Sequence, residues 1–441
     1  MSVDYRAFFC AGVDDVDPFV GNLIRLEEER QKRRIILIPS ESYAPAPVRQ
    51  ALGSVFNNVY AEGYPPTQMV INDEALLADL SHQLAHYRRY ADRRFYKGAD
   101  YVHFVEAVAQ RRAAACFANA RVDAREIYAN VQPLSGAVAN LAVYDALMEP
   151  GDTLMGMDLF QGGHLTHGSQ YNVSGKRFKV VSYGVSKRDE RLDYDEILEL
   201  AQNARPKLIV AGYTSYPWAP DFERFREIAD DVGAYLLADI AHPAGLAISG
   251  AYPNPVGIAD VVSFTTHKTL CGPRGACILT TDRRLASRID AAVFPGIQGG
   301  PHPNKFAAMA VAFEIARSEA FRALQRQIVE NAQALGEALT RRGLRLAYGG
   351  TDTHLLLLDL KARPSGAPRA DAILYGEPVA RILELAGLIV NKQTIPGDTV
   401  TALATGIRLG TPWVTQRGMG PAEMDQLADC IARIVLGIVP F

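Results

Sequence analysis

The sequence predicts an α/β fold in which a large domain with a mostly parallel sheet precedes a smaller C-terminal α/β domain. Between about residues 130 and 280, short apolar runs rich in branched side chains alternate with helical stretches, which is typical of a parallel sheet covered on both faces. Residues 305–343 have helical spacing almost throughout, and a second alternation of strands and helices follows residues 349–350. A chain of 441 residues, 48 % hydrophobic and 22 % charged, is long enough to bury both cores.

Each element follows from the local pattern, in chain order. Asp17 and Pro18 are typical of a helix start, and helical spacing continues from there to residue 33. Apolar runs predict the strands of the large domain at residues 153–157, 178–183, 207–211, 235–238, 261–265 and 276–280. Apolar residues at helical spacing predict helices at 138–148 and 222–232. The C-terminal patterns predict strands at 354–360, 388–391 and 407–409 and helices at 377–386 and 423–436. We therefore divide the chain into an N-terminal helical arm (1–35), a large domain (36–305) and a small domain (306–441).

Composition excludes several functional classes. The 46 basic and 49 acidic residues give a net charge of −3, which excludes a polycation that coats nucleic acid or an anionic membrane. No apolar run approaches the roughly 20 residues that cross a bilayer, and residues 1–17 lack the pattern of a signal peptide. The five scattered cysteines predict free thiols in a reducing cytoplasm. Neither Cys271 with Cys277 nor His82 with His86 has the further ligands of a metal site, so we expect no metal.

Polar or small residues follow several of the predicted strands, where ligands of open parallel sheets bind. They are Asp239 and His242, His267 and Lys268, Ser135 with Gly136 and Ala137 at a helix start, and His164 after two glycines. Each has an ordinary explanation by itself, such as a helix cap, a core histidine or a solvated lysine. Together they supply an amine with a lowered pKa, a carboxylate, an aromatic ring and free N–H groups for phosphate. This combination matches the needs of pyridoxal phosphate.

Longer segments of the chain resemble the serine hydroxymethyltransferase family, also called glycine hydroxymethyltransferase. They are collinear and extend from about residue 16 to 435. They are IPSES (38–42), YAEGYP (60–65), FYKGADYV (95–102), NVQPLSGAVAN (130–140), GGHLTHGS (162–169), ADIAHPAGL (238–246), TTHKTLCGPRG (265–275), VFPGIQGGPH (293–302), GTDTHLLLLDL (350–360), NKQTIPGD (391–398) and GIRLGTP (406–412).

The resemblance implies a fold and an activity. The fold would be that of the fold-type-I pyridoxal-phosphate transferases, which is aspartate aminotransferase-like. The protein would be a cytoplasmic homodimer, with a tetramer left open, and its active sites would lie at the subunit interface. It would interconvert serine plus tetrahydrofolate and glycine plus 5,10-methylenetetrahydrofolate, a reaction of one-carbon metabolism and glycine biosynthesis.

The resemblance also implies residue roles. Lys268 would form the Schiff base with the coenzyme, and Glu62, His267 and Thr265 would be the other catalytic residues. Coenzyme contacts would come from Asp239 at the ring nitrogen, His164 stacked on the ring, His242, Thr214, Arg274, Ser135, Gly136 and Ala137, and from Tyr60, Gly299 and Gly300 of the other subunit. Substrate contacts would come from Arg408, which suits a bidentate carboxylate pair, and from Ser40, Tyr96 and His242. The folate pocket would contain Leu159, Gly163, His164, Leu165, Gln393, Glu62 and Phe294.

The chain departs from the family pattern in three places. Residues 66–93 are an additional segment, and Leu76, Leu77, Leu80, Leu84 and Tyr87 predict one helix over residues 72–93. This helix either packs at the rim of the protein or alters substrate access and the dimer edge. Lys97 replaces a glycine. Ala137 replaces a serine of the phosphate site, and Gln393 replaces an asparagine associated with the folate ring.

These departures leave two alternative functions. A folate-independent aldolase or transaldolase for 3-hydroxy amino acids, such as threonine or allo-threonine, would keep the coenzyme and lose folate. An inactive protein that only binds the coenzyme is disfavoured by the joint presence of Lys268, Glu62 and Arg408.

Overall fold

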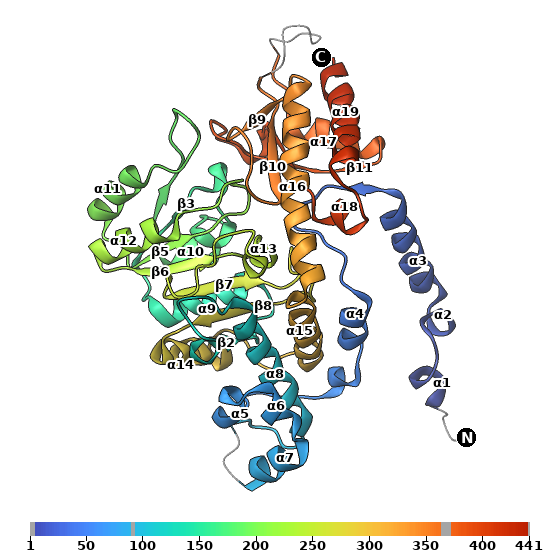
Figure 1. The fold of residues 1–441 in the computed structure, drawn as a ribbon, viewed down its shortest axis with the longest axis vertical. Coiled ribbons are helices and arrows are strands. Elements are labelled where there is room, and N and C mark those ends of the chain that lie inside the picture. Colours follow the sequence, from blue (N-terminus) through green and yellow to red (C-terminus); the bar gives the residue numbers. More distant parts are fainter. Residues whose placement is uncertain (1–4, 90–92, 363–371, 440–441) are drawn as a thin grey trace.

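A seven-stranded sheet forms the centre of the large part of the molecule (Figure 1). The computed structural model describes residues 5–89, 93–362 and 372–439. The strand order is β2-β8-β7-β6-β5-β3-β4; strands β3 to β7 are parallel, and β8 is antiparallel to both of its neighbours. The strands are β2 (Tyr128–Asn130), β3 (Thr153–Met157), β4 (Lys179–Tyr183), β5 (Leu208–Ala211), β6 (Tyr235–Asp239), β7 (Val261–Thr265) and β8 (Ala276–Thr280). The predicted mostly parallel sheet is therefore confirmed.

Helices cover both faces of this sheet because its strands are apolar on both sides. One face packs against α9 and α14 through side chains such as Val143 and Ile289. The other face packs against α8, α12 and α15 through Phe117, Phe225 and Phe313. The helices of this part are α8 (Asp100–Phe117), α9 (Gly136–Leu147), α10 (Val173–Arg177), α11 (Tyr194–Ala204), α12 (Phe222–Val232), α13 (Ala244–Ser249), α14 (Arg283–Ala291) and α15 (Pro303–Ala316).

The C-terminal part has its own core around a four-stranded antiparallel sheet of order β12-β13-β10-β9. Leu335, Leu356, Leu383, Leu409 and Ile431 meet in that core. Its elements are α16 (Glu319–Arg341), β9 (Arg345–Ala347), β10 (Leu355–Asp359), α17 (Gly376–Leu385), β11 (Leu388–Ile389), β12 (Asn391–Gln393), β13 (Gly406–Gly410), α18 (Pro412–Gln416) and α19 (Pro421–Gly437). Helix α15 packs with the core of the large domain, and α16 packs with the cores of both domains. These contacts do not mark a boundary at residue 305, so the division there stays a prediction.

The prediction of one strand over residues 388–391 was wrong, because this segment forms parts of two strands in different sheets. Leu388 and Ile389 pair in parallel with Ile35 and Ile36 of β1 (Ile35–Ile36), whereas Asn391 begins a strand that pairs with β13. The segment therefore passes from one sheet to another at Val390, a change of partner that a local apolar pattern does not reveal.

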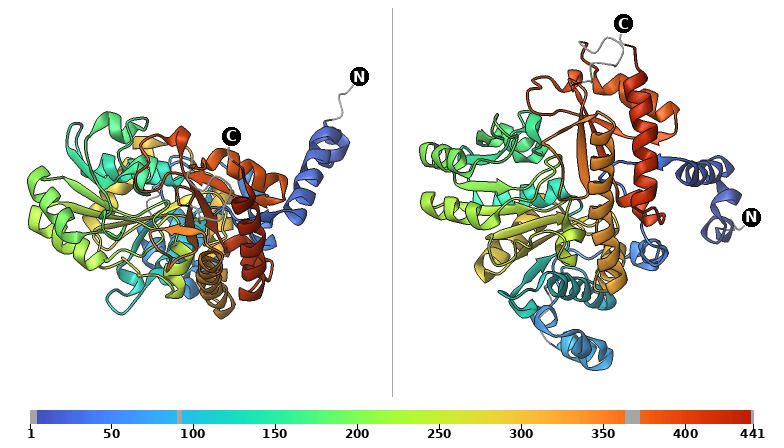
Figure 2. Two further views of the ribbon diagram at one scale, coloured as in Figure 1. Left: turned by 90° about the horizontal axis from the view of Figure 1, so that it is seen from above. Right: turned by 45° about the horizontal axis from the view of Figure 1, so that its top comes forward.

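The N-terminal segment projects away from the body, as both views of Figure 2 show. It contains α1 (Arg6–Phe9), α2 (Val13–Val16) and α3 (Pro18–Arg33), and the Asp17 carboxylate caps α3 by accepting the Val20 N–H. Phe8, Phe19, Leu23 and Ile24 are exposed along it. The chain then rejoins the body at residues 35 and 36, which pair with β11, and α4 (Ala46–Leu52) packs on α15.

The additional segment does not form the single helix predicted over residues 72–93. It forms α5 (Thr67–Ile71), α6 (Glu74–Ala78) and α7 (Leu80–Arg89), and residues 90–92 lie outside the described residues. The break falls at Asp79, whose side chain accepts the His82 N–H and the Ser81 hydroxyl and so begins a new helix. Leu77 and Tyr87 pack on Phe104 of α8, while Leu76 and Leu80 are exposed. These contacts favour the interpretation that the segment packs at the rim.

Neither a membrane-spanning helix nor a metal-binding cluster is found in the described residues. None of the described helices is long and apolar enough to cross a membrane. Within the same residues, no group of three or more histidine, cysteine, aspartate or glutamate side chains is arranged to hold a metal ion.

Candidate active site

A cavity of about 220 Å³ lies where the carboxyl ends of β3, β5, β6 and β7 meet the first turn of α9. It has the position expected for a ligand site in an open parallel sheet. The residues that line it are Ser135, Gly136, Ala137, Asn140, His164, His167, Tyr213, Thr214, Asp239, Ala241, His242, Thr265, His267 and Lys268. Most of them were predicted from the sequence. Asn140, His167, Tyr213 and Ala241 were not.

Lys268 follows β7, where the chain has just left the buried sheet. Burial of the amine, together with the nearby charges of Arg408 and Arg274, lowers its pKa to about 8, although Asp239 acts in the opposite direction. A substantial share of this amine is therefore neutral near physiological pH, and a neutral amine can attack an aldehyde.

Asp239, the last residue of β6, is held by three hydrogen bonds. His167 Nε2 and Asn140 Nδ2 donate to Oδ2 at 2.9 and 2.8 Å, and the Ala241 N–H donates to Oδ1 at 2.9 Å. Because His167 Nδ1 accepts the His164 N–H, the ring proton is on Nε2 and points at the carboxylate. Burial alone would raise the pKa of Asp239, but the hydrogen bonds from His167 and Asn140 hold it well below its usual range.

A short chain of hydrogen bonds supports this carboxylate from behind. The Ser263 hydroxyl donates to Asn140 Oδ1 at 2.7 Å, so the Asn140 amide is oriented with its nitrogen toward Asp239. Ser263 and Asp239 lie on neighbouring strands, β7 and β6, and they are paired in register. The signal for His167 was present in the sequence, since it belongs to the same GGHLTHGS segment as His164. Asn140 likewise ends the NVQPLSGAVAN segment, although no role was predicted for it.

The first turn of α9 offers a narrow space for an anion. Ser135 caps this helix, and its hydroxyl accepts the Val138 N–H at 3.4 Å. A Cβ at Gly136 would lie 2.8 Å from the Thr265 methyl group, so only glycine leaves this space free. Across the cavity, His267 Nδ1 is buried without a hydrogen-bond partner among the described residues. A helix start with free N–H groups and a cradle that a side chain would fill are the features a phosphate needs.

Arg408 lies on β13 of the C-terminal part and reaches toward the Lys268 cavity. Its Nη1 donates to the Thr214 carbonyl at 2.9 Å, and its Nε donates to Asn391 Oδ1 at 3.3 Å. Burial lowers its pKa to about 10, which still leaves the guanidinium charged at neutral pH. The site therefore joins both parts of the molecule.

Two histidines beside this arginine are uncharged. His242 Nδ1 lies 3.2 Å from His354 Nε2, and the two rings are stacked. Burial lowers the pKa of His354 to about 3 and that of His242 well below its usual value. Burial also lowers the pKa of His164 to about 4. The neutral imidazole rings of His164 and His242 thus line the cavity beside the Lys268 amine, and the Arg408 guanidinium lies close by.

A second group of predicted residues lies elsewhere in the same chain. The Tyr60 hydroxyl donates to Glu62 Oε1 at 3.4 Å, and its ring packs on Tyr96. A Cβ at Gly300 would lie 2.7 Å from the Tyr60 ring. Glu62, Phe294 and Gly299 line a different cavity, of about 540 Å³. The structure brings these residues together with one another, and none of them lines the Lys268 cavity.

The remaining predicted residues do not line the Lys268 cavity either. Gly163 follows β3 and packs closely against the backbone. A Cβ there would lie 2.0 Å from the Met157 carbonyl oxygen, so only glycine fits this position. Leu165 is exposed, and Gln393 Nε2 donates to the Thr394 hydroxyl. The other predicted residues that are absent from the lining of this cavity are Ser40, Leu159 and Arg274.

The comparison with known proteins decides the family. The family model described as serine hydroxymethyltransferase matches residues 13–88 and 72–431. This chain belongs to the serine hydroxymethyltransferase family. The two matched ranges overlap within residues 72–88, inside the additional segment.

Several curated relatives carry the name serine hydroxymethyltransferase. The protein of Synechococcus sp. (strain JA-3-3Ab) is 47 % identical over 424 residues, covering 95 % of this chain and 90 % of its own. The protein of Sorangium cellulosum (strain So ce56) is 48 % identical over 429 residues, covering 97 % and 91 %. The protein of Caulobacter sp. (strain K31) is 44 % identical over 439 residues, covering 99 % and 92 %.

Membership of the serine hydroxymethyltransferase family confirms the resemblance, the fold class and the prediction of a transferase enzyme. It favours the predicted function over the folate-independent aldolase. The family uses pyridoxal phosphate, and it acts on small molecules. The individual residue roles stay predictions.

Proposed function

We propose that this chain is a pyridoxal-phosphate-dependent serine hydroxymethyltransferase that uses tetrahydrofolate as the one-carbon acceptor. The observation that carries the proposal is the arrangement around Lys268. An amine with a lowered pKa, an ionised carboxylate and the cradle at Gly136 line one cavity. When bound, pyridoxal phosphate supplies an aldehyde and a ring that withdraws electrons from the substrate Cα.

The residues of the chain would divide the remaining work. The Lys268 amine would hold the coenzyme, and the first turn of α9 would bind its phosphate. The Asp239 carboxylate would keep a proton on the ring nitrogen, because His167 and Asn140 maintain its negative charge. Arg408 would bind the substrate carboxylate and place the amino acid over the cavity, since a guanidinium holds a carboxylate with two parallel hydrogen bonds. His164 would stack on the ring as a neutral imidazole.

A homodimer would complete the site. Tyr60, Glu62 and Gly299 lie away from the Lys268 cavity of their own chain, so they could act there only in a second copy. The Glu62 carboxyl would then be the acid–base group at the substrate hydroxymethyl group. The exposed apolar side chains of the projecting arm, such as Phe19 and Leu23, offer a surface for that copy. Leu159, Leu165 and Gln393 would contact folate.

A cytoplasmic location is part of the same proposal. The five cysteines are all free thiols, and Cys116, Cys271 and Cys277 are buried. Unpaired buried thiols suit a reducing compartment.

A spectroscopic titration tests the proposal. Purified protein saturated with pyridoxal phosphate is mixed with glycine, and the visible spectrum is recorded as tetrahydrofolate is added. We expect tetrahydrofolate to strengthen the absorption of the glycine complex and serine cleavage to require it. A spectrum indifferent to folate, with acetaldehyde released from threonine or allo-threonine, would instead establish the aldolase.

A further inference from the structure

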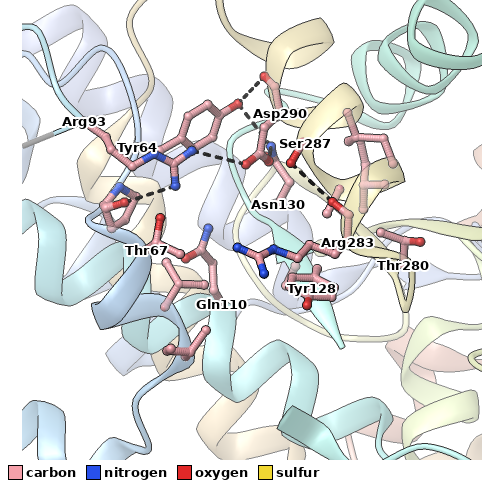
Figure 3. A pocket seen from close by; sticks show the side chains of 17 residues that line it. Tyr64, Thr67, Arg93, Gln110, Tyr128, Asn130, Thr280, Arg283, Ser287 and Asp290 are labelled. Carbon is pink, nitrogen blue, oxygen red and sulfur yellow. Dashed lines mark hydrogen bonds and ion pairs between the residues drawn. The ribbon is translucent and has the colours of Figure 1, made fainter. Parts of the chain in front are cut away.

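A second cavity, of about 160 Å³, lies between the additional segment and the large domain (Figure 3). Thr67, Val70 and Arg93 come from the segment, and the opposite wall is formed by α8, β2, β8 and α14. None of its lining residues lines the Lys268 cavity. No predicted role concerns it.

Two polar side chains face this cavity without a partner. Gln110 of α8 is 5 % exposed, and its Oε1 accepts no hydrogen bond within the described residues. Arg283 begins α14, and its guanidinium has no hydrogen bond or ion pair in the described part of the chain. Figure 3 shows the Arg283 side chain directed across the cavity toward Gln110. The buried Gln110 acceptor is costly to leave without a donor, and the exposed Arg283 guanidinium adds an unpaired positive charge to the lining of the same cavity.

The other charged groups at the cavity are already engaged. Arg93 lies 3.8 Å from the Asp290 carboxylate, and Asn130 Nδ2 donates to that carboxylate at 2.8 Å. The Tyr64 hydroxyl donates to the Asp290 carbonyl oxygen at 2.6 Å. Among the described residues that line the cavity, the positive charge of Arg283 is therefore the one left without a counterpart, and it favours an anion.

We propose that this cavity binds a small carboxylic acid that also carries an ammonium or hydroxyl group. The carboxylate pairs with Arg283, and the ammonium or hydroxyl group donates to Gln110 Oε1. A cavity of about 160 Å³ has room for a molecule as small as glycine or glycolate. The ligand touches the additional segment and the large domain at once, so it strengthens their contact.

Binding stoichiometry tests the proposal with the full chain saturated with pyridoxal phosphate. Equilibrium dialysis with labelled glycine is expected to find two sites per wild-type chain, one of them at Lys268. Arg283→Gln is expected to remove one site, or to weaken it about tenfold or more, because a charge-assisted bond is lost. Arg284→Gln is the matched control, because Arg284 is the next residue of α14 and does not line the cavity.

The outcomes separate this proposal from the proposed function. If the Lys268 cavity binds no amino acid, the wild type still has one site and Arg283→Gln has none. Equal numbers of sites with equal affinities in wild type and Arg283→Gln would overturn the second site. Competition then tests the donor: glycine and glycolate are expected to bind, one through an ammonium and the other through a hydroxyl group. Acetate, which has neither, is expected to bind about tenfold more weakly, and equal binding of acetate would overturn the role of Gln110.

Discussion

Gly63 and Arg94 pair across an antiparallel bridge, so the chain leaves the body at residue 63 and returns to the same point at residue 94. The Phe95 N–H donates to the Glu62 carbonyl at 3.1 Å, and the Arg94 guanidinium donates to the Gly63 carbonyl at 3.1 Å. Gln132 Nε2 holds the same carbonyl at 2.8 Å. The backbone on either side of Glu62 is therefore positioned by the body of the protein, and the additional segment is a closed excursion from it.

Deletion of residues 66–92 is expected to leave turnover within about twofold of wild type, because the bridge that positions Glu62 remains. The variant is expected to melt at a lower temperature, since Phe104 loses the cover of Leu77 and Tyr87. Steady-state kinetics and thermal unfolding measure the two effects. The control is Leu77→Ala, which should lower the free energy of unfolding by about 2–5 kcal/mol without altering turnover. A large loss of turnover in a deletion variant that melts normally would contradict this interpretation.

The buried ion pair between Arg94 and Glu106 gives a prediction about stability. Both side chains are fully buried. Arg94→Met is expected to lower the free energy of unfolding by about 3–5 kcal/mol, because it leaves the Glu106 carboxylate buried without its cation. The double variant Arg94→Met with Glu106→Gln is expected to recover part of that loss. Urea unfolding of the four proteins measures the coupling, and additive losses would show that the pair is not coupled.

His167 is expected to control the ionisation of Asp239. In His167→Leu, burial dominates and the pKa of Asp239 rises. A carboxyl with a depressed pKa keeps its charge until the pH falls through that pKa, so the variant loses the charge at a higher pH than wild type. We expect it to release pyridoxal phosphate at a higher pH during acid titration, followed by visible absorbance. His82→Leu, in the exposed part of α7, is the control, and identical release curves for all three proteins would refute the role.

Substitution of Arg408 is expected to act on substrate binding. Arg408→Met should raise the KM for serine by about 10- to 100-fold, because a charge-assisted pair in a buried site is lost. Arg408→Lys should recover only part of the affinity, since an ammonium cannot form the bidentate pair. Initial-rate kinetics decide the matter, and an unchanged KM in the methionine variant would exclude Arg408 as the carboxylate ligand.

The lowered pKa of Lys268 predicts a pH dependence for loading of the coenzyme. The apoprotein is expected to attach pyridoxal phosphate faster as the pH rises to about 8 and no faster beyond it, because only the neutral amine attacks. The same shift makes the folded apoprotein bind fewer protons than the unfolded chain between about pH 8 and 10.5, so this group adds stability as the pH rises through that window.

Stopped-flow absorbance across this range measures the loading rate. Arg408→Met is expected to move the plateau to higher pH, because the Arg408 charge contributes to the lowered pKa. Lys268→Ala is the negative control and should show no attachment. A rate that keeps rising well above pH 8 in wild type would contradict the lowered pKa.

Where local pattern decides an element, the sequence was sufficient. The strands β3, β7 and β8 and the helix α12 have the predicted bounds, because each is an apolar or amphipathic run ended by turn or capping residues. The additional segment shows the limit of the same reasoning. Its apolar spacing is helical, but the Asp79 side chain competes for backbone N–H groups and divides the helix.

The sequence by itself determined the alternation of strands and helices, the family, and the identity of the amine at Lys268 and the carboxylate at Asp239. Only the tertiary structure decided that His167 and Asn140 hold that carboxylate, that Arg408 arrives from the other sheet, and that the Glu62 group lies in a separate cavity. These contacts join residues far apart in the chain, and side-chain hydrogen bonds between distant strand ends leave no periodic trace in the sequence. They depend on which strands become neighbours, and that is settled by the packing of the whole sheet.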